Sequence, residues 1–214
     1  MALTLHGYWR SGTSYRTRIA LNLKGLEYAQ VTHDLRKGEQ KDAAYTALAP
    51  QGLVPALEIG NGIVLPQSVA ILEWLEETHP EPPLLPRNAN DRAIVRAMCA
   101  MIGSDVHPIN NLRILKYLKN ELGQEQAAID AWARHWIAEG FAALDTMIAR
   151  HGTGYAYGDT PTLVDCYLVP QVYSAERFGS DLAPYPDLMA AYERAAVHPA
   201  IAAAHPDRQP DADQ

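Results

Sequence analysis

Three hydroxyls and a glycine separate an apolar run from a helical pattern in the segment Tyr-Trp-Arg-Ser-Gly-Thr-Ser-Tyr-Arg, residues 8–16. Ser11, Thr13 and Ser14 are good N-cap residues, and the helix they open presents unpaired backbone N–H groups and a positive dipole end. Such a turn can bind a thiolate or a carboxylate without a metal. A merely structural βα turn is the alternative, and the flanking Arg10 and Arg16 favour the anion site.

Composition limits the classes of partner. The 214 residues carry a net charge of -7, which argues against nucleic acid and anionic membrane surfaces as partners. Cys99 and Cys166 lie in apolar helical patterns without metal-ligand spacing, so we expect neither a disulfide nor a metal site. The N-terminus lacks a signal-peptide pattern and no apolar run reaches the roughly 20 residues of a membrane span, which together predict a cytoplasmic protein.

The first part of the chain predicts a thioredoxin-like α/β domain over residues 1–80. Apolar alternation and helical spacing predict a β-α-β start, an irregular or helical stretch, a hairpin around Gly60-Asn61-Gly62, and a helix opened by Gln67-Ser68. The strands are expected at 3–9, 27–31, 54–59 and 63–65, and the helices at 14–24 and 67–79. This order places a parallel pair and an antiparallel pair in one sheet.

The second part predicts an all-α domain. Prolines concentrate in residues 81–89, which we take as the linker to a helical domain over 90–205. Its long helical patterns cover 91–117, 124–150 and 163–178, the last opened by a capping box from Thr162 to Asp165 that we interpret as structural. Residues 206–214, rich in Pro, Asp and Gln, are expected to be disordered.

This layout resembles the cytosolic glutathione transferases over residues 3 to 205. Residues 10–25 resemble the zeta-class signature, with Ser11-Gly12-Thr13 in place of the usual Ser-Ser-Cys triplet. That departure, with the blocks at 105–113 and 159–171, resembles the bacterial glutathione-dependent maleylpyruvate isomerases within that class. The Val54-Pro55 and Gln67-Ser68 pairs indicate only the wider superfamily.

The resemblance implies a glutathione site and a homodimer. A cis-Pro55 would place the Val54 backbone against the cysteinyl part of glutathione, and the Ser68 N–H and hydroxyl would take the γ-glutamyl carboxylate. Asp105 would reach glutathione bound to the partner subunit. The other implied glutathione contacts are Gln51, Gln67, Ser11, His107 and Asn111.

The glutathione thiol would lie over the N-terminus of the first helix, where hydrogen-bond donors and positive charge lower a thiol pKa from near ~8.5. Ser11 is our first choice of donor to the thiolate and Thr13 the second. Addition of the thiolate to a cis double bond conjugated to a carbonyl makes that bond single. Rotation and elimination then return the trans isomer.

Arginines are expected for the substrate, because guanidinium groups bind carboxylates in bidentate geometry and stabilise a developing enolate. The family's blocks match Arg10, Arg113 and Arg177, with Arg10 also counted as catalytic. His107 and Asn111 are spaced i, i+4, which on a helix kinked at Pro108 would put them on one face; the resemblance assigns both to glutathione or substrate contact.

These expectations predict an isomerase that converts maleylpyruvate to fumarylpyruvate in aromatic-acid breakdown. Maleylacetoacetate isomerase is the nearest alternative, since one extra carbon changes binding by only about 1 to 3 kcal/mol. A general glutathione transferase would need an apolar pocket, against which the arginines argue. A non-catalytic glutathione-binding protein on the same fold is the alternative from another class.

Overall fold

The computed structural model describes residues 2–213 and divides into two compact units. The first comprises residues up to Leu84 together with those from Val197 onward, and the second is Leu85–Ala196. In the described part of the chain, no helix is long and apolar enough to cross a membrane. The two units are described separately below.

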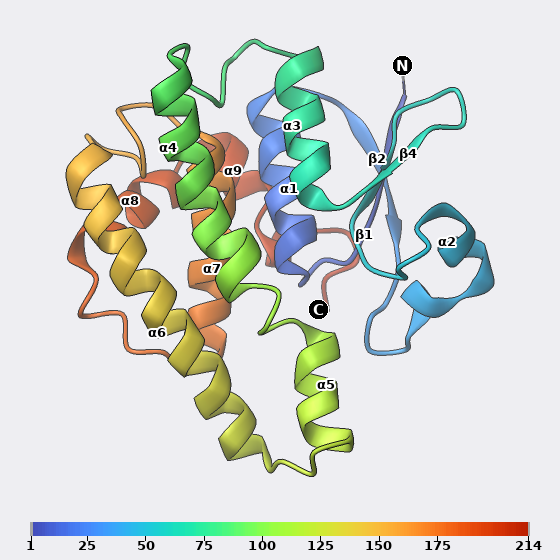
Figure 1. Cartoon of the computed structure of the whole chain (residues 1–214). Helices are drawn as coiled ribbons and strands as arrows, with labels where there is room; N and C mark the ends of the chain where they lie inside the picture. The colour runs from blue at the N-terminus through green and yellow to red at the C-terminus, as the bar shows by residue number, and fades with distance from the viewer. Residues whose placement is uncertain (1, 214) are drawn as a thin grey trace. The chain divides into compact units, whose positions relative to one another are not determined.

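The first unit is a four-stranded mixed sheet with helices. Strand order is β2-β1-β3-β4, with β1 parallel to β2 and antiparallel to β3, and β3 antiparallel to β4. The elements are β1 (Leu3–Gly7), α1 (Gly12–Leu23), β2 (Tyr28–Thr32), η1 (Glu39–Lys41), α2 (Ala43–Leu48), β3 (Ala56–Glu58), β4 (Val64–Pro66) and α3 (Ser68–Thr78). The predicted thioredoxin-like arrangement is therefore confirmed, although β1 ends two residues before the predicted end at residue 9 (Figure 1).

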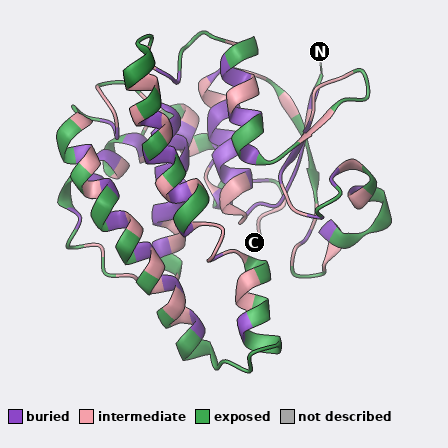
Figure 2. Cartoon of the chain, in the orientation of Figure 1, coloured by how far each residue is buried: buried purple, intermediate pink, exposed green. Residues whose placement is uncertain are grey.

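Helix α1 forms the centre of this unit. Every residue from Ser14 to Leu21 is buried, as the purple colour of α1 in Figure 2 shows. It packs beside α3. On the sheet face that carries His6, the Tyr45 ring of α2 contacts the His6 and His33 rings. Because α1 is held so completely, the first turn of this helix is a rigid place for a binding site.

The C-terminal segment corrects two predictions. Helix α9 (Pro199–Ala203) and the 3₁₀ helix η3 (Pro206–Arg208) belong to the first unit, whereas the sequence predicts that residues up to 205 belong to the helical domain. Residues 206–213 are also not disordered, since Gln209 and Asp211 are hydrogen-bonded to Gln30 and Trp9; Gln214 lies outside the described residues. Specific backbone and side-chain partners on the first unit outweigh the polar composition that had suggested disorder.

The second unit is helical, as predicted. Its elements are α4 (Ala89–Ala100), the π-helix η2 (Met101–Val106), α5 (Leu112–Asn120), α6 (Gln126–His151), α7 (Leu163–Arg177) and α8 (Pro186–Ala196). The predicted capping box is present at the start of α7, where Thr162 and Asp165 satisfy each other's backbone N–H groups. Trp132 and Trp136 pack edge to face with ring centroids 5.7 Å apart, in accord with a packing role.

One long helix over 91–117 was predicted, and the structure breaks it. The π-helix ends at Val106, and α5 begins anew after Asn111, whose side chain caps it. Pro108 has no N–H to continue the ladder and its ring clashes with the preceding turn, so the helix stops there rather than bending. The expectation that His107 and Asn111 share one helix face was therefore wrong: Asn111 has extended backbone, with ψ at 162°.

Candidate active site at the start of helix α1

Ser11 is the N-cap of α1. Its Oγ accepts a hydrogen bond of 3.3 Å from the Ser14 N–H, and its backbone is extended, as an N-cap requires. Of the three candidate caps in the opening segment, the structure selects this one. The first turn of α1 contains no acidic residue, so no carboxylate within that turn offsets the positive end of the helix dipole.

Thr13 joins this turn to the segment before β3. Its Oγ1 donates to the Val54 carbonyl oxygen at 3.0 Å and lies 3.1 Å from Ser11 Oγ. The Val54–Pro55 peptide is cis, as the resemblance implied. Three of the predicted site residues, Ser11, Thr13 and Val54, are thus brought together by direct contacts.

Two residues that sequence reasoning missed hold the segment from residue 51 to residue 54. The Tyr45 hydroxyl donates to the Leu53 carbonyl at 2.7 Å, and burial raises the pKa of the Tyr45 phenol to about 12. Lys41 Nζ donates to the Gln51 carbonyl at 3.0 Å. No motif marked these side chains, because their partners are backbone carbonyls that any sequence would provide.

Gln51, Gln67 and Ser68 form the second cluster of predicted residues. Gln67 Nε2 donates to Gln51 Oε1, so these two exposed side chains lie together. Gln67 precedes α3 with a φ of 71°, a left-handed conformation that costs a non-glycine residue on the order of 1–3 kcal/mol. That strain turns the chain sharply before the helix and leaves its first N–H groups without helical partners.

Arg16 lies behind this helix start. Its Nη1 donates to Ser68 Oγ at 3.0 Å, and Arg16 and Ser68 are only 2% and 3% exposed. Because the Ser68 oxygen already accepts from the guanidinium, its own hydroxyl proton is available to an anion. The charge of Arg16 and the dipole of α3 both favour a carboxylate at this point. Arg16 was noted in the sequence only as a flanking charge.

A histidine pair lies under the sheet near the same segment. His6 Nε2 is 2.6 Å from Glu58 Oε1, and His6 Nδ1 is 3.0 Å from His33 Nε2. Burial, with a smaller contribution from the charge of His6, lowers the pKa of His33. The network joins β1, β3 and the residue that follows β2, and both histidine rings contact the Tyr45 ring, whose hydroxyl donates to the Leu53 carbonyl.

Arg10 is the arginine nearest this site in the chain. Its guanidinium lies over the Trp9 ring, 5.3 Å from the ring centroid. Within residues 2–213, no acidic side chain forms an ion pair with Arg10.

The remaining predicted residues belong to the second unit and are described within it. Asp105 is exposed on η2, and His107 follows directly at its C-cap. The side-chain oxygen of Asn111 accepts a 3.3 Å hydrogen bond from the Ile114 N–H, and this bond does not involve the amide nitrogen of Asn111. Arg113 is exposed on α5, and the guanidinium of Arg177 lies 5.9 Å from the Tyr173 ring centroid.

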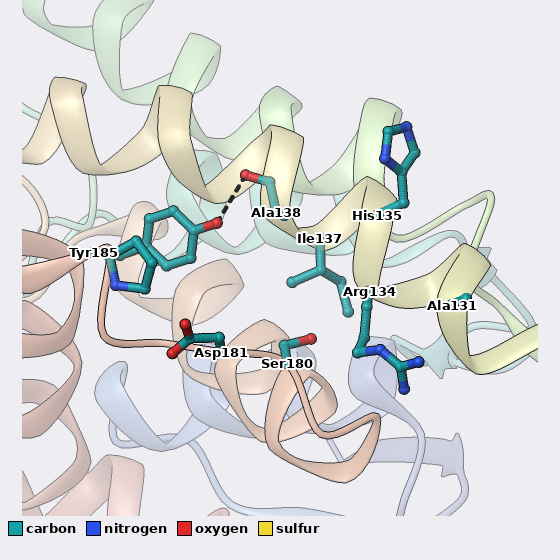
Figure 3. A pocket seen from close by; sticks show the side chains of 9 residues that line it. Ala131, Arg134, His135, Ile137, Ala138, Ser180, Asp181 and Tyr185 are labelled. Carbon is teal, nitrogen blue, oxygen red and sulfur yellow. Dashed lines mark hydrogen bonds between the residues drawn. The ribbon is translucent and has the colours of Figure 1, made fainter. Parts of the chain in front are cut away.

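A cavity of about 380 Å³ lies elsewhere in the second unit, between α6 and the segment that precedes α8. Figure 3 shows the Tyr185 hydroxyl pointing to the Ala138 carbonyl at its wall, where the two atoms are 3.2 Å apart. None of the residues predicted for the site lines this cavity. It is a separate feature of the helical unit.

A thioredoxin-like unit with a cis-proline, followed along the chain by a helical unit, is the domain composition of the cytosolic glutathione transferases. Residues 10–78 match the family model of the glutathione S-transferase N-terminal domain, and residues 110–204 match that of the C-terminal domain. The chain belongs to the glutathione S-transferase family.

Individual relatives indicate which members of this family the chain resembles. A curated maleylpyruvate isomerase from a Ralstonia species is 50% identical over 212 residues, covering 98% of this chain and 99% of that protein. The maleylacetoacetate isomerase of Pseudomonas aeruginosa is 44% identical, with 98% of each chain covered.

Solved structures agree with these relatives. The holo structure of a maleylpyruvate isomerase, described as a bacterial zeta-class glutathione S-transferase, has a TM-score of 0.96 at 51% identity, covering 98% of this chain and 100% of that one. A maleylacetoacetate isomerase from Anaeromyxobacter dehalogenans with bound glutathione has a TM-score of 0.90 at 46% identity, covering 99% and 98%. The predicted membership of the zeta class is confirmed.

Proposed function

We propose that this chain is a glutathione-dependent cis–trans isomerase that converts maleylpyruvate to fumarylpyruvate. The observation that carries the proposal is the set of contacts that the Ser11 and Thr13 hydroxyls make at the start of α1. A carbonyl oxygen can only accept, so Thr13 donates its single hydroxyl proton to Val54. In the contact between Ser11 and Thr13, Ser11 is then the donor.

This assignment favours Ser11 over Thr13 as the donor to a thiolate. The Ser11 oxygen is occupied by the Ser14 N–H, so the hydroxyl is anchored, yet its proton can turn from Thr13 to a nearby anion. Turning it costs only one neutral hydrogen bond, and a bond to an anion is roughly twice as strong. Thr13 would lose its bond to Val54 by the same move.

Glutathione, when bound, supplies the thiolate that adds reversibly to the cis double bond. The residues of the chain bind and orient it. The Val54 backbone would hold the cysteinyl part, while Gln51, Gln67 and the start of α3 would hold the γ-glutamyl end. At that end, the buried Arg16 behind Ser68 supports a carboxylate. The donors present therefore fit the chemical groups of glutathione.

The arginines support a dicarboxylate keto acid as the substrate. We assign Arg10, Arg113 and Arg177 to the two carboxylates and the developing enolate, where guanidinium groups stabilise negative charge. His107 and the amide nitrogen of Asn111 are proposed as contacts to glutathione or substrate. Maleylacetoacetate is the second candidate substrate, since several relatives act on it according to their names.

The decisive experiment compares substrates on the purified chain. Maleylpyruvate, maleylacetoacetate and a chloroaromatic electrophile are followed in parallel, each with and without glutathione. We expect glutathione-dependent isomerisation with the higher kcat/KM for maleylpyruvate. A higher kcat/KM for maleylacetoacetate would transfer the assignment to that substrate, and isomerisation of neither diacid would refute the proposal.

We further propose a cytoplasmic homodimer. Ile63 beside β4 and Val69 in α3 are 51% and 47% exposed, which supports a partner over this edge of the first unit. Cys99 and Cys166 are both buried in the manner of small apolar side chains, in keeping with a reducing compartment. Sedimentation equilibrium tests the dimer, and Val69→Lys is expected to shift the protein toward monomer.

A further inference from the structure

The C-terminal segment of the first unit holds the loop that precedes α1. The backbone N–H of Trp9 donates to Asp211 Oδ2 at 3.0 Å, and the Trp9 carbonyl accepts from Arg18 Nη2 at 2.8 Å. Arg18 in turn donates from Nε to the Ala204 carbonyl at 3.1 Å. Both backbone polar groups of Trp9 are therefore tied to residues 204–211, one directly and one through Arg18.

This segment has supports of its own. Gln209 Nε2 donates to the Ala203 and His205 carbonyls at 3.1 and 2.8 Å, and Gln209 Oε1 accepts from Gln30 in β2 at 3.2 Å. Gln209 is only 8% exposed. Because the backbone is fixed at Gln209, two residues before Asp211, the position of the Asp211 carboxylate does not depend on its hydrogen bond to Trp9 alone.

Trp9 in turn restricts the side chain of Arg10, the residue that follows it. Trp9 is 7% exposed, and the guanidinium of Arg10 lies over its ring, 5.3 Å from the ring centroid. A cation over an aromatic face is attracted to it, so the ring is a platform that limits where the guanidinium can point. If the Trp9 backbone shifts, both the platform and the start of the Arg10 side chain shift with it.

We propose that the C-terminal segment positions Arg10 for the substrate carboxylate, with Asp211 as a positioning residue that acts through Trp9. The inference rests on the proposed function, because Arg10 is assigned there as a substrate ligand. It assigns a positioning role to the Asp211 carboxylate and the Ala204 carbonyl, neither of which is proposed to touch substrate or glutathione.

Three variants test the hold on the loop. Asp211→Ala removes the acceptor, Asp211→Asn keeps an acceptor oxygen without the charge, and Asp207→Ala is a matched control whose native side chain is 71% exposed. Hydrogen–deuterium exchange is measured on the peptide that contains Trp9. We expect exchange of the Trp9 amide to rise about tenfold in Asp211→Ala, because its hydrogen bond is lost, and to stay near wild type in the other two.

Kinetics test the consequence. In Asp211→Ala we expect kcat/KM for the diacid to fall about tenfold, since small displacements of a positioning group are costly, while the Kd of glutathione stays unchanged. Asp211→Asn should restore most of the loss. In an Arg10→Ala background, Asp211→Ala should cause no further loss, because the group that it positions is absent.

Unchanged exchange at Trp9, an additive loss in the Arg10→Ala background, or an equal loss of glutathione affinity would each overturn the proposal. Failure of the wild-type chain to isomerise either diacid would instead refute the proposed function. The exchange measurement still decides in that case whether Asp211 holds the loop. Circular dichroism on all variants separates unfolding from these effects. If Asp211→Ala does not fold, Asp211→Leu, which removes the acceptor but keeps a side chain of similar size, takes its place with the same expected results.

Discussion

Thr13 Oγ1 donates a 3.0 Å hydrogen bond to the Val54 carbonyl across 41 positions of the chain, and so joins the first turn of α1 to the residue before cis-Pro55. This contact gives the two neighbouring hydroxyls, those of Ser11 and Thr13, different roles. Thr13 holds two segments of the site together, and Ser11 keeps the proton that can turn toward a thiolate.

Ser11→Ala and Thr13→Val should therefore differ in kind. We expect Ser11→Ala to raise the thiol pKa of bound glutathione and to lower kcat about tenfold, as loss of a hydrogen bond to a charged group requires. Thr13→Val should mainly weaken glutathione binding, by roughly threefold to tenfold, because the Val54 carbonyl loses its donor. Thiolate absorbance of the complex against pH and calorimetric Kd values distinguish them. A larger thiol pKa rise in Thr13→Val would reverse the assignment.

Arg16→Lys should weaken glutathione binding although the charge is kept. The lysine ammonium cannot reproduce the planar guanidinium that reaches Ser68 Oγ at 3.0 Å, so we expect an increase in Kd of about tenfold. Calorimetry measures it, with the exposed Arg87→Lys as the control. If Arg16 acts through Ser68, its effect should largely disappear in a Ser68→Ala background. A full tenfold effect in that background would contradict this route.

Arg113→Ala should affect substrate capture. We expect KM for the diacid to rise about tenfold with kcat within twofold of wild type, because a carboxylate contact made equally in ground and transition states is lost. Steady-state kinetics at saturating glutathione measure this. Arg150→Ala, an exposed arginine of α6, is the control. A fall in kcat with an unchanged KM would instead place Arg113 at the developing enolate.

Asp165 should make stability depend on pH. Complete burial raises the pKa of this carboxyl to about 6, against 3.8 as its ordinary value, while hydrogen bonds from Thr162 and Ala156 oppose the rise. The folded protein then binds the proton more tightly than the unfolded chain. This contribution to stability is present below pH ~4 and is lost as the pH rises through about 6.

Urea unfolding of wild type and Asp165→Asn at pH 4.5 and pH 7 measures that contribution. Between these two values, wild type should lose about 2 kcal/mol more unfolding free energy than the variant, which has no carboxyl to titrate. At both pH values Asp165→Asn should be less stable, since an amide nitrogen replaces an oxygen that accepts from a backbone N–H. Asp159→Asn is the exposed control, and equal losses in all three proteins would rule out Asp165 as the source.

Several features of the site followed from local sequence. A hydroxyl cap before the first helix, the capping box of Thr162 and Asp165, and the helix opened at Ser68 depend on residues within one turn of each other. Such short-range patterns are readable because the hydrogen bonds they make hardly depend on the rest of the fold. The break at Pro108 was visible as well, but a kink was expected where the structure ends one helix and caps another.

Other features required partners distant in sequence. Three side chains without a local motif contact distant partners. Arg16 donates to the Ser68 hydroxyl, Tyr45 donates to the Leu53 carbonyl, and Asp211 accepts from the Trp9 N–H. Their importance comes from what lies opposite them after folding, often a backbone group that carries no sequence signal.

The sequence by itself therefore determined the class of protein, the two-part organisation and a helix start suited to an anion. The tertiary structure decided which hydroxyl keeps a mobile proton, and that the C-terminal residues from 204 to 211 hold the loop before α1. The physical reason is the range of the interactions. Periodicity and capping act within a few residues, whereas the orientation of a donor depends on the one acceptor that folding brings to it.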